Sequence, residues 1–84
     1  MYRYLVMAIR TPQFQDSVIE AHQAFLERLR QNGSLEMSGP FTDKTGGAYI
    51  LRASNYAEAQ ELAFTDPLHT TESSNIMVYE WNVK

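Results

Sequence analysis

Hydrophobic residues follow a strand-like pattern in some segments of this chain and a helix-like pattern in others, and the order of these segments limits the possible folds. Residues 2–10, YRYLVMAIR, are rich in tyrosine, valine and isoleucine and end before a Thr-Pro pair, which predicts a strand. Between residues 11 and 33, apolar positions recur instead at the spacing of a helix whose opposite side is polar. Two short apolar runs, a second helical segment and a final strand follow, at 34–41, 46–53, 54–64 and 76–83. The predicted order is therefore β-α-β-β-α-β.

The ends of the first predicted helix carry signals of their own. Ser17 and Glu20 have the spacing of a capping box, and Thr11-Pro12 is an alternative start. Asn32-Gly33 supplies a residue suited to the left-handed conformation in which many helices end. The helix is thus predicted to lie between these two points.

The second predicted helix begins at a capping residue, Ser54 or Asn55, with Glu58 in its first turn. The segment that follows it, residues 65–75 (TDPLHTTESSN), is polar and predicts a loop before the last strand.

This order of elements is the split β-α-β pattern of the ferredoxin-like folds, in the α+β class. Right-handed crossovers place four antiparallel strands in the order 4-1-3-2, with both helices on one face of the sheet. The 84 residues predict a single domain, 1–84. The chain has no cysteine, which excludes disulfides, thiol catalysis and thiolate metal sites.

Both faces of the predicted sheet are apolar or aromatic. In the first strand Tyr2, Tyr4, Val6 and Ala8 alternate with Leu5, Met7 and Ile9, and in the last strand Ile76 and Val78 alternate with Met77, Tyr79 and Trp81. Two helices can cover only one face, and soluble monomers avoid large exposed apolar patches. The sequence therefore predicts a homodimer that packs sheet face against sheet face.

Charge and hydropathy exclude several classes of partner. Ten acidic and seven basic residues give a net charge of −3, so no basic surface for nucleic acid is expected. The apolar run near the N-terminus is too short for a signal peptide or a membrane span. We therefore expect a cytoplasmic protein with neither a membrane nor a nucleic-acid partner.

The predicted topology brings several polar residues to one end of the molecule. The first helix starts at the end where the first strand stops, the second strand ends there, and the second helix arrives there. Arg10, His22, Ser38-Gly39-Pro40 and Asp66 can therefore line one cleft. Their separations along the chain do not suggest this; only the fold does.

His22 and Asp66 each have a structural and a functional interpretation. His22 lies in an apolar stripe, where a histidine is often a core residue bonded to backbone, yet imidazole titrates near neutral pH and suits general acid/base work. Asp66 precedes proline and can cap a following turn. A carboxylate after a helix C-terminus faces the negative end of the helix dipole, so a nearby cation would stabilise it. A protonated His22 can be that cation. For Asp66 the two interpretations are compatible.

The remaining motifs favour structure. Gly39 and Pro40 suit the end of a strand, although Ser38 can donate a hydrogen bond and Gly39 lets a ligand approach the backbone. The glycines in TGG (45–47) precede a strand and lack the lysine of a phosphate-binding loop, so they predict a turn. His69 is expected to face solvent. No histidine spacing typical of a metal site is present, so neither a metal nor a cofactor is expected.

The chain also resembles the YciI-like family. The resemblance rests on H-x-x-F-L-x-x-L-x-x-N-G (22–33), SGP (38–40), GG followed by YIL (46–51) and DP (66–67), in that order. It implies a small ferredoxin-like dimer of the dimeric α+β-barrel type, with a site containing a histidine and an aspartate, here His22 and Asp66. Most members lack an assigned reaction, and a few relatives act in aromatic-compound degradation, including dehalogenation. After DP the family commonly has a glycine-containing stretch, whereas this chain has LHTTESSN, which predicts a different rim of the pocket.

Three functions follow as alternatives. The leading one is a cofactor-free enzyme in which His22 and Asp66 act as an acid/base pair on a small polar or aromatic-derived molecule, by isomerase, lyase or dehalogenase chemistry. Ser38, Gly39, Pro40 and Arg10 would bind the ligand. The second is a non-catalytic ligand-binding or accessory module that uses the same cleft. The third is a cofactor-free oxygenase, which the sequence neither supports nor excludes.

Overall fold

The computed structural model describes residues 2–84 and contains one four-stranded sheet and three helices. The elements follow one another as β1 (Tyr2–Arg10), α1 (Val18–Gln31), β2 (Leu35–Pro40), β3 (Gly46–Ala53), α2 (Tyr56–Phe64), α3 (Pro67–Thr70) and β4 (Ser74–Glu80). The predicted β-α-β-β-α-β order is confirmed, with the short helix α3 added before the last strand.

The sheet has the strand order β2-β3-β1-β4, which is the predicted 4-1-3-2 order viewed from the other edge. Its three pairs are all antiparallel, and Leu51 of β3 and Glu80 of β4 flank Tyr4 of β1. Because β1 and β2 each pair antiparallel with β3, they run in the same direction. Their C-terminal ends therefore lie at the same end of the sheet.

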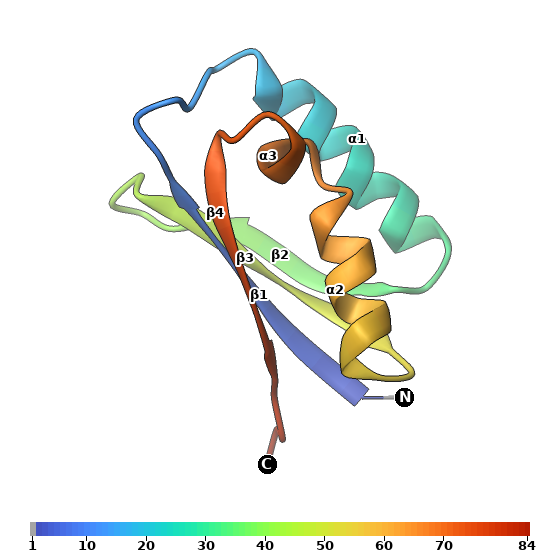
Figure 1. Cartoon of the computed structure of the whole chain (residues 1–84). Coiled ribbons are helices and arrows are strands. Elements are labelled where there is room, and N and C mark those ends of the chain that lie inside the picture. Colours follow the sequence, from blue (N-terminus) through green and yellow to red (C-terminus); the bar gives the residue numbers. More distant parts are fainter. Residues whose placement is uncertain (1) are drawn as a thin grey trace.

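All three helices lie on one face of the sheet (Figure 1). The side chains that point from β1 toward the helices, Tyr4, Val6 and Ala8, are buried. Tyr4 and Val6 pack with the apolar stripe of α1 and with the inner residues of the other strands, namely Phe25, Leu26, Leu29, Tyr49, Leu51 and Val78. Ala8 packs with Val18 and Leu68 in a second, smaller cluster. The core thus sits between the helices and this covered face.

The opposite face, which we call the open face, has no helix over it (Figure 1). In the strand register Leu5 lies between Ile50 and Tyr79, and Met7 lies between Ala48 and Met77. Tyr79 is 50% exposed. The prediction that a second copy covers this face stays a prediction.

Two predicted details are wrong. Residues 65–75 do not form only a loop, because the Asp66 side chain accepts a hydrogen bond from the Leu68 N–H and Pro67 occupies the first turn, which together start α3. The capping box at Ser17 is absent, since Ser17 has helical angles (φ −62°, ψ −20°) and makes no side-chain cap bond.

Other helix ends follow prediction. Asn55 caps α2 by accepting a hydrogen bond from the Glu58 N–H, and the Glu58 carboxylate accepts one from the Ser54 N–H, as in a capping box. Gly33 adopts a positive φ of 84° after α1. Within residues 2–84 no helix combines the length and hydropathy needed to cross a bilayer, and the cytoplasmic location stays a prediction.

Candidate functional site

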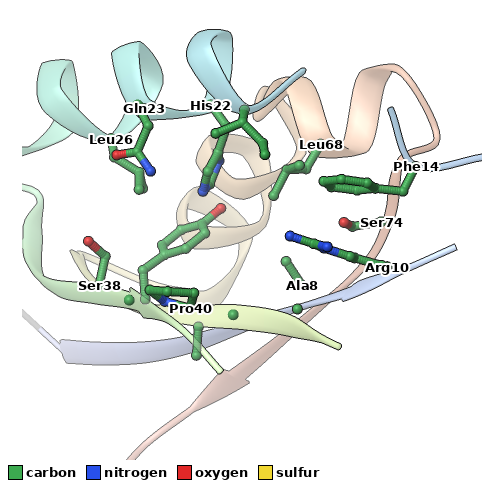
Figure 2. Close-up of a pocket in the computed structure, with 16 residues that line it drawn as sticks. Ala8, Arg10, Phe14, His22, Gln23, Leu26, Ser38, Pro40, Leu68 and Ser74 are labelled. Carbon is green, nitrogen blue, oxygen red and sulfur yellow. The ribbon is translucent and has the colours of Figure 1, made fainter. Parts of the chain in front are cut away.

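A cavity of about 410 Å³ opens between α1, α3 and the end of the sheet where β1 and β2 stop (Figure 2). This volume lies within the range of small-molecule sites. Its lining residues are Ala8, Arg10, Phe14, Ile19, His22, Gln23, Leu26, Ser38, Gly39, Pro40, Gly46, Gly47, Ala48, Tyr49, Leu68 and Ser74. The fold therefore brings Arg10, His22 and Ser38-Gly39-Pro40 to one cavity.

His22 lies in the second turn of α1 and its ring points down toward the sheet (Figure 2). Its side chain is 16% exposed, and Nδ1 is 2.9 Å from Oδ1 of Asp66. The ring lies at 25° to the Phe25 ring, with 6.4 Å between the centroids, and is tilted by 48° to the Tyr49 ring, at 6.2 Å. The imidazole is thus held on one side by a carboxyl group and on the others by aromatic rings.

Asp66 does not line the cavity. It is completely buried, at the N-cap of α3 and behind the cavity wall that His22 and Tyr49 form. Besides the contact with His22, its Oδ1 accepts the Leu68 N–H at 2.9 Å, and its Oδ2 accepts the Tyr49 hydroxyl at 3.0 Å. Both oxygens of the carboxyl group therefore act as hydrogen-bond acceptors.

This arrangement fixes the tautomer of His22. An ionised carboxylate only accepts, so we assign the proton of the neutral imidazole to Nδ1. Nε2 is then left with a free lone pair. A histidine whose one nitrogen is held by a buried carboxylate can take up and release a proton at the other.

Tyr49 is the site residue that the sequence analysis missed as a polar partner. Its pKa is raised far above the ordinary value of 10.0, first by burial and then by the charge of Asp66 and the hydrogen bond to it. Tyr49 therefore stays protonated and acts as a donor. A signal was available: Tyr49 alternates with Ile50 along β3 and so shares the covered face with Leu51. The alternation shows that the Tyr49 side chain lies on the covered face, but it does not show that Asp66 is its hydrogen-bond partner.

Steric crowding explains why glycine occupies the first two positions of β3. Gly46 has a positive φ of 158°, and a Cβ there would collide with the carbonyl oxygen of Ala8. A Cβ on Gly47 would lie 2.7 Å from the carbonyl oxygen of Gly39. Both glycines lie within β3 and not in the predicted turn, and they allow neighbouring strands to approach closely at the cavity floor.

His69 lies outside the cavity. It is exposed, and its ring stacks on Phe64 with the centroids 4.6 Å apart. In the part of the chain from residue 2 to 84, no three histidine, aspartate or glutamate side chains gather as a metal site would require. The expectation that the protein needs no metal or cofactor stays a prediction.

Fold and site together define a class: a small α+β protein of ferredoxin-like topology with a cavity beside a buried His–Asp contact. The sequence profile of the YCII-related domain matches residues 2–82, and the chain belongs to this family, which confirms the predicted resemblance. The chain is 42% identical over 84 residues to the uncharacterized protein YjpA of Bacillus subtilis (strain 168), covering 100% of this chain and 99% of that protein.

A solved structure shares the fold. It is the 5-chloro-2-hydroxyhydroquinone dehydrochlorinase TftG from Burkholderia phenoliruptrix AC1100, in complex with 2,5-dihydroxybenzoquinone. The TM-score is 0.77 over 98% of this chain and 95% of the other, at 21% sequence identity. At this identity the likeness establishes the architecture alone.

Proposed function

We propose that the protein is a cofactor-free enzyme in which His22 is the general acid/base for a small polar or aromatic-derived molecule bound in the cavity. The observation that carries the proposal is the 2.9 Å contact between His22 Nδ1 and the fully buried Asp66 at the cavity wall. Because Asp66 cannot touch a ligand, we assign it the role of positioning residue. It holds the tautomer of His22 and stabilises the imidazolium that forms when Nε2 accepts a proton.

The chemistry is proton transfer at carbon. Nε2 of His22 takes a proton from a C–H group activated by a neighbouring carbonyl or enol, and the C–H electron pair enters a new double bond. In an isomerisation the imidazolium returns the proton to another carbon. In the loss of HCl from a chlorinated hydroquinone, Nε2 instead takes a hydroxyl proton and the imidazolium gives it to the ring carbon that bears chlorine. Chloride then leaves that carbon with its bonding pair while a second hydroxyl loses its proton, and the product is a quinone. Ser38 and the backbone around Gly39 orient the oxygens of the ligand.

The dehydrochlorinase of the same fold supports this class of reaction and supplies a test substrate. We expect wild-type protein to release chloride from 5-chloro-2-hydroxyhydroquinone. His22→Gln should lower kcat about 10²- to 10⁴-fold. Urea unfolding of the same samples shows whether His22→Gln keeps the fold.

His69→Gln is the matched control, because it removes an exposed histidine that lies outside the cavity. It should leave the rate unchanged. A His22→Gln rate equal to that of wild type contradicts the proposal. Stabilisation of the protein by 2,5-dihydroxybenzoquinone that persists in both His22→Gln and Asp66→Asn, without turnover, would favour a non-catalytic binding module instead.

We also propose that the protein is a homodimer joined through the open face. The apolar and aromatic residues Leu5, Met7, Met77 and Tyr79 on that face support it, since no helix within residues 2–84 covers them. Light scattering after size exclusion should give twice the 9.6 kDa chain mass. Met7→Lys, at the centre of the face, should give a monomer, whereas Gln31→Lys on the exposed end of α1 should not. A wild-type mass of one chain at micromolar concentration would contradict the dimer.

A further inference from the structure

The ionisable groups that line the cavity differ in sign from the protein as a whole. The chain carries ten acidic and seven basic residues. Among the lining residues, however, Arg10 and His22 are basic and none is acidic. Among the described residues that line the cavity of this anionic protein, the only permanent charge is the positive guanidinium of Arg10.

Arg10 is directed into this cavity by the strand and held there by a ring. It is the last residue of β1, and the strand period of two places it on the covered face with Ala8. Its Cζ lies 4.0 Å from the centroid of the Phe14 ring, so the guanidinium stacks on an aromatic face. Figure 2 shows its nitrogen atoms pointing inward, toward the part of the cavity below His22.

Arg10 has no carboxylate partner within residues 2–84. The ion pairs in that range engage Arg3, Arg30, Arg52 and His22 instead. Ser74, which faces Arg10 in the register of β1 and β4, also lines the cavity and is 4% exposed. The Arg10 guanidinium offers N–H donors in one plane, and the Ser74 hydroxyl adds another donor. Together these groups suit the two oxygens of a carboxylate.

We propose that Arg10, with Ser74, is the specificity-determining group for the carboxylate of a small organic acid. This inference rests on the proposed function, because it names the class of molecule on which His22 acts. Arg10, Phe14 and Ser74 lie at one end of the cavity and Ser38 and Gln23 at the other, with His22 between them (Figure 2). The ligand is therefore an aromatic or enolic acid whose second oxygen meets Ser38 and whose reacting carbon lies below His22.

Titration calorimetry with 4-hydroxybenzoate and 4-hydroxybenzamide tests the proposal, since the two probes share a shape and differ in charge. We expect wild-type protein to bind the acid more tightly than the amide, and Arg10→Met to weaken the acid about tenfold or more. Arg10→Met should leave the affinity for the amide unchanged. Arg10→Lys keeps the charge without the fork and should fall between. Arg28→Met, which removes an exposed arginine outside the cavity, is the control for net charge.

Equal affinity for acid and amide, no measurable binding of the acid, or a loss in Arg28→Met as large as in Arg10→Met would each overturn the proposal. Competition by inorganic phosphate that exceeds competition by benzoate would do so as well, because the site would then select phosphates. These binding measurements do not require turnover. A wild-type protein that prefers the acid but releases chloride neither from 5-chloro-2-hydroxyhydroquinone nor from its carboxylated analogue would leave this inference standing and contradict the proposed acid/base chemistry.

Discussion

Two carboxylates each contact several hydrogen-bond donors: Asp66 on the covered face of the sheet and Glu36 on the open face. The two sets of donors differ in their chemistry. Asp66 is completely buried and meets an imidazole, a phenol and a backbone N–H. The Glu36 side chain is 18% exposed and meets the guanidinium groups of Arg3, at 2.8 Å, and Arg52, at 2.9 Å. Both carboxylates accept several hydrogen bonds, but only Asp66 has an imidazole among its partners.

The difference separates a site from a structural ion cluster. Arginine keeps its proton throughout the range in which proteins are stable, so the Glu36 cluster can position strands but cannot transfer a proton. Asp66 contacts His22, which lines the cavity and is the residue that we propose as the general acid/base. The number of hydrogen bonds does not distinguish Asp66 from Glu36. They differ in the chemistry of their donors and in the cavity that lies next to the His22–Asp66 contact.

Substitution of Asp66 should have the largest effect on stability. Asp66→Ala leaves the Tyr49 hydroxyl and the Leu68 N–H buried without an acceptor, and we expect it to cost about 3–5 kcal/mol of unfolding free energy. That cost approaches the whole stability expected of a small domain, at the low end of about 5–15 kcal/mol. Urea unfolding followed by circular dichroism measures it.

Two milder variants serve as controls for this prediction. Asp66→Asn keeps the shape and one carbonyl acceptor, so it should cost less, about 1–2 kcal/mol, while removing the charge that stabilises a His22 imidazolium. Tyr49→Phe removes one donor only and should also cost about 1–2 kcal/mol. If Asp66→Ala is no more destabilising than Tyr49→Phe, the buried network is not the structural centre that its contacts indicate.

Sequence periodicity was enough for the fold because each element's pattern is local. The alternation in 2–10 and the helical spacing around Phe25 decide which side chains are buried, and the order of elements then limits the topology. The meeting of Arg10, His22 and Ser38 at one cavity follows from that topology, since their strands and helix share one end. Their roles on a ligand stay a prediction.

Other features depend on side-chain geometry that no local pattern contains. The bond from Tyr49 to Asp66 joins residues 17 positions apart, and it requires α2 and α3 to place the carboxyl group directly behind a ring on β3. The short helix α3 forms because Asp66 caps it, in a segment whose polar composition is typical of a loop. The same residue thus fulfils its expected capping role and also contacts His22, and only the packed structure shows that one side chain does both.

Glu36→Gln should have the smallest effect, and its pH dependence identifies it. The guanidinium of Arg3, followed by that of Arg52, holds the pKa of Glu36 below its ordinary value of 4.5. A carboxyl group whose pKa is lower in the folded than in the unfolded chain adds stability above the unfolded value, and that stability is lost as the pH falls through the folded value. Wild-type protein should therefore be slightly more stable than Glu36→Gln above pH 4.5, and the difference should close in more acidic solution.

Asp43→Asn is the matched control for this last comparison. The Thr45 hydroxyl, with the Thr45 backbone N–H, lowers the pKa of Asp43 in the turn between β2 and β3, so this residue contributes its own acid-sensitive stability. The two contributions should add, because the residues share no partner. Unfolding free energies measured between about pH 3 and about pH 7 separate them. A Glu36→Gln difference that stays constant over this range would mean that Glu36 acts through packing and not through charge, and the contrast with Asp66 would then need another basis.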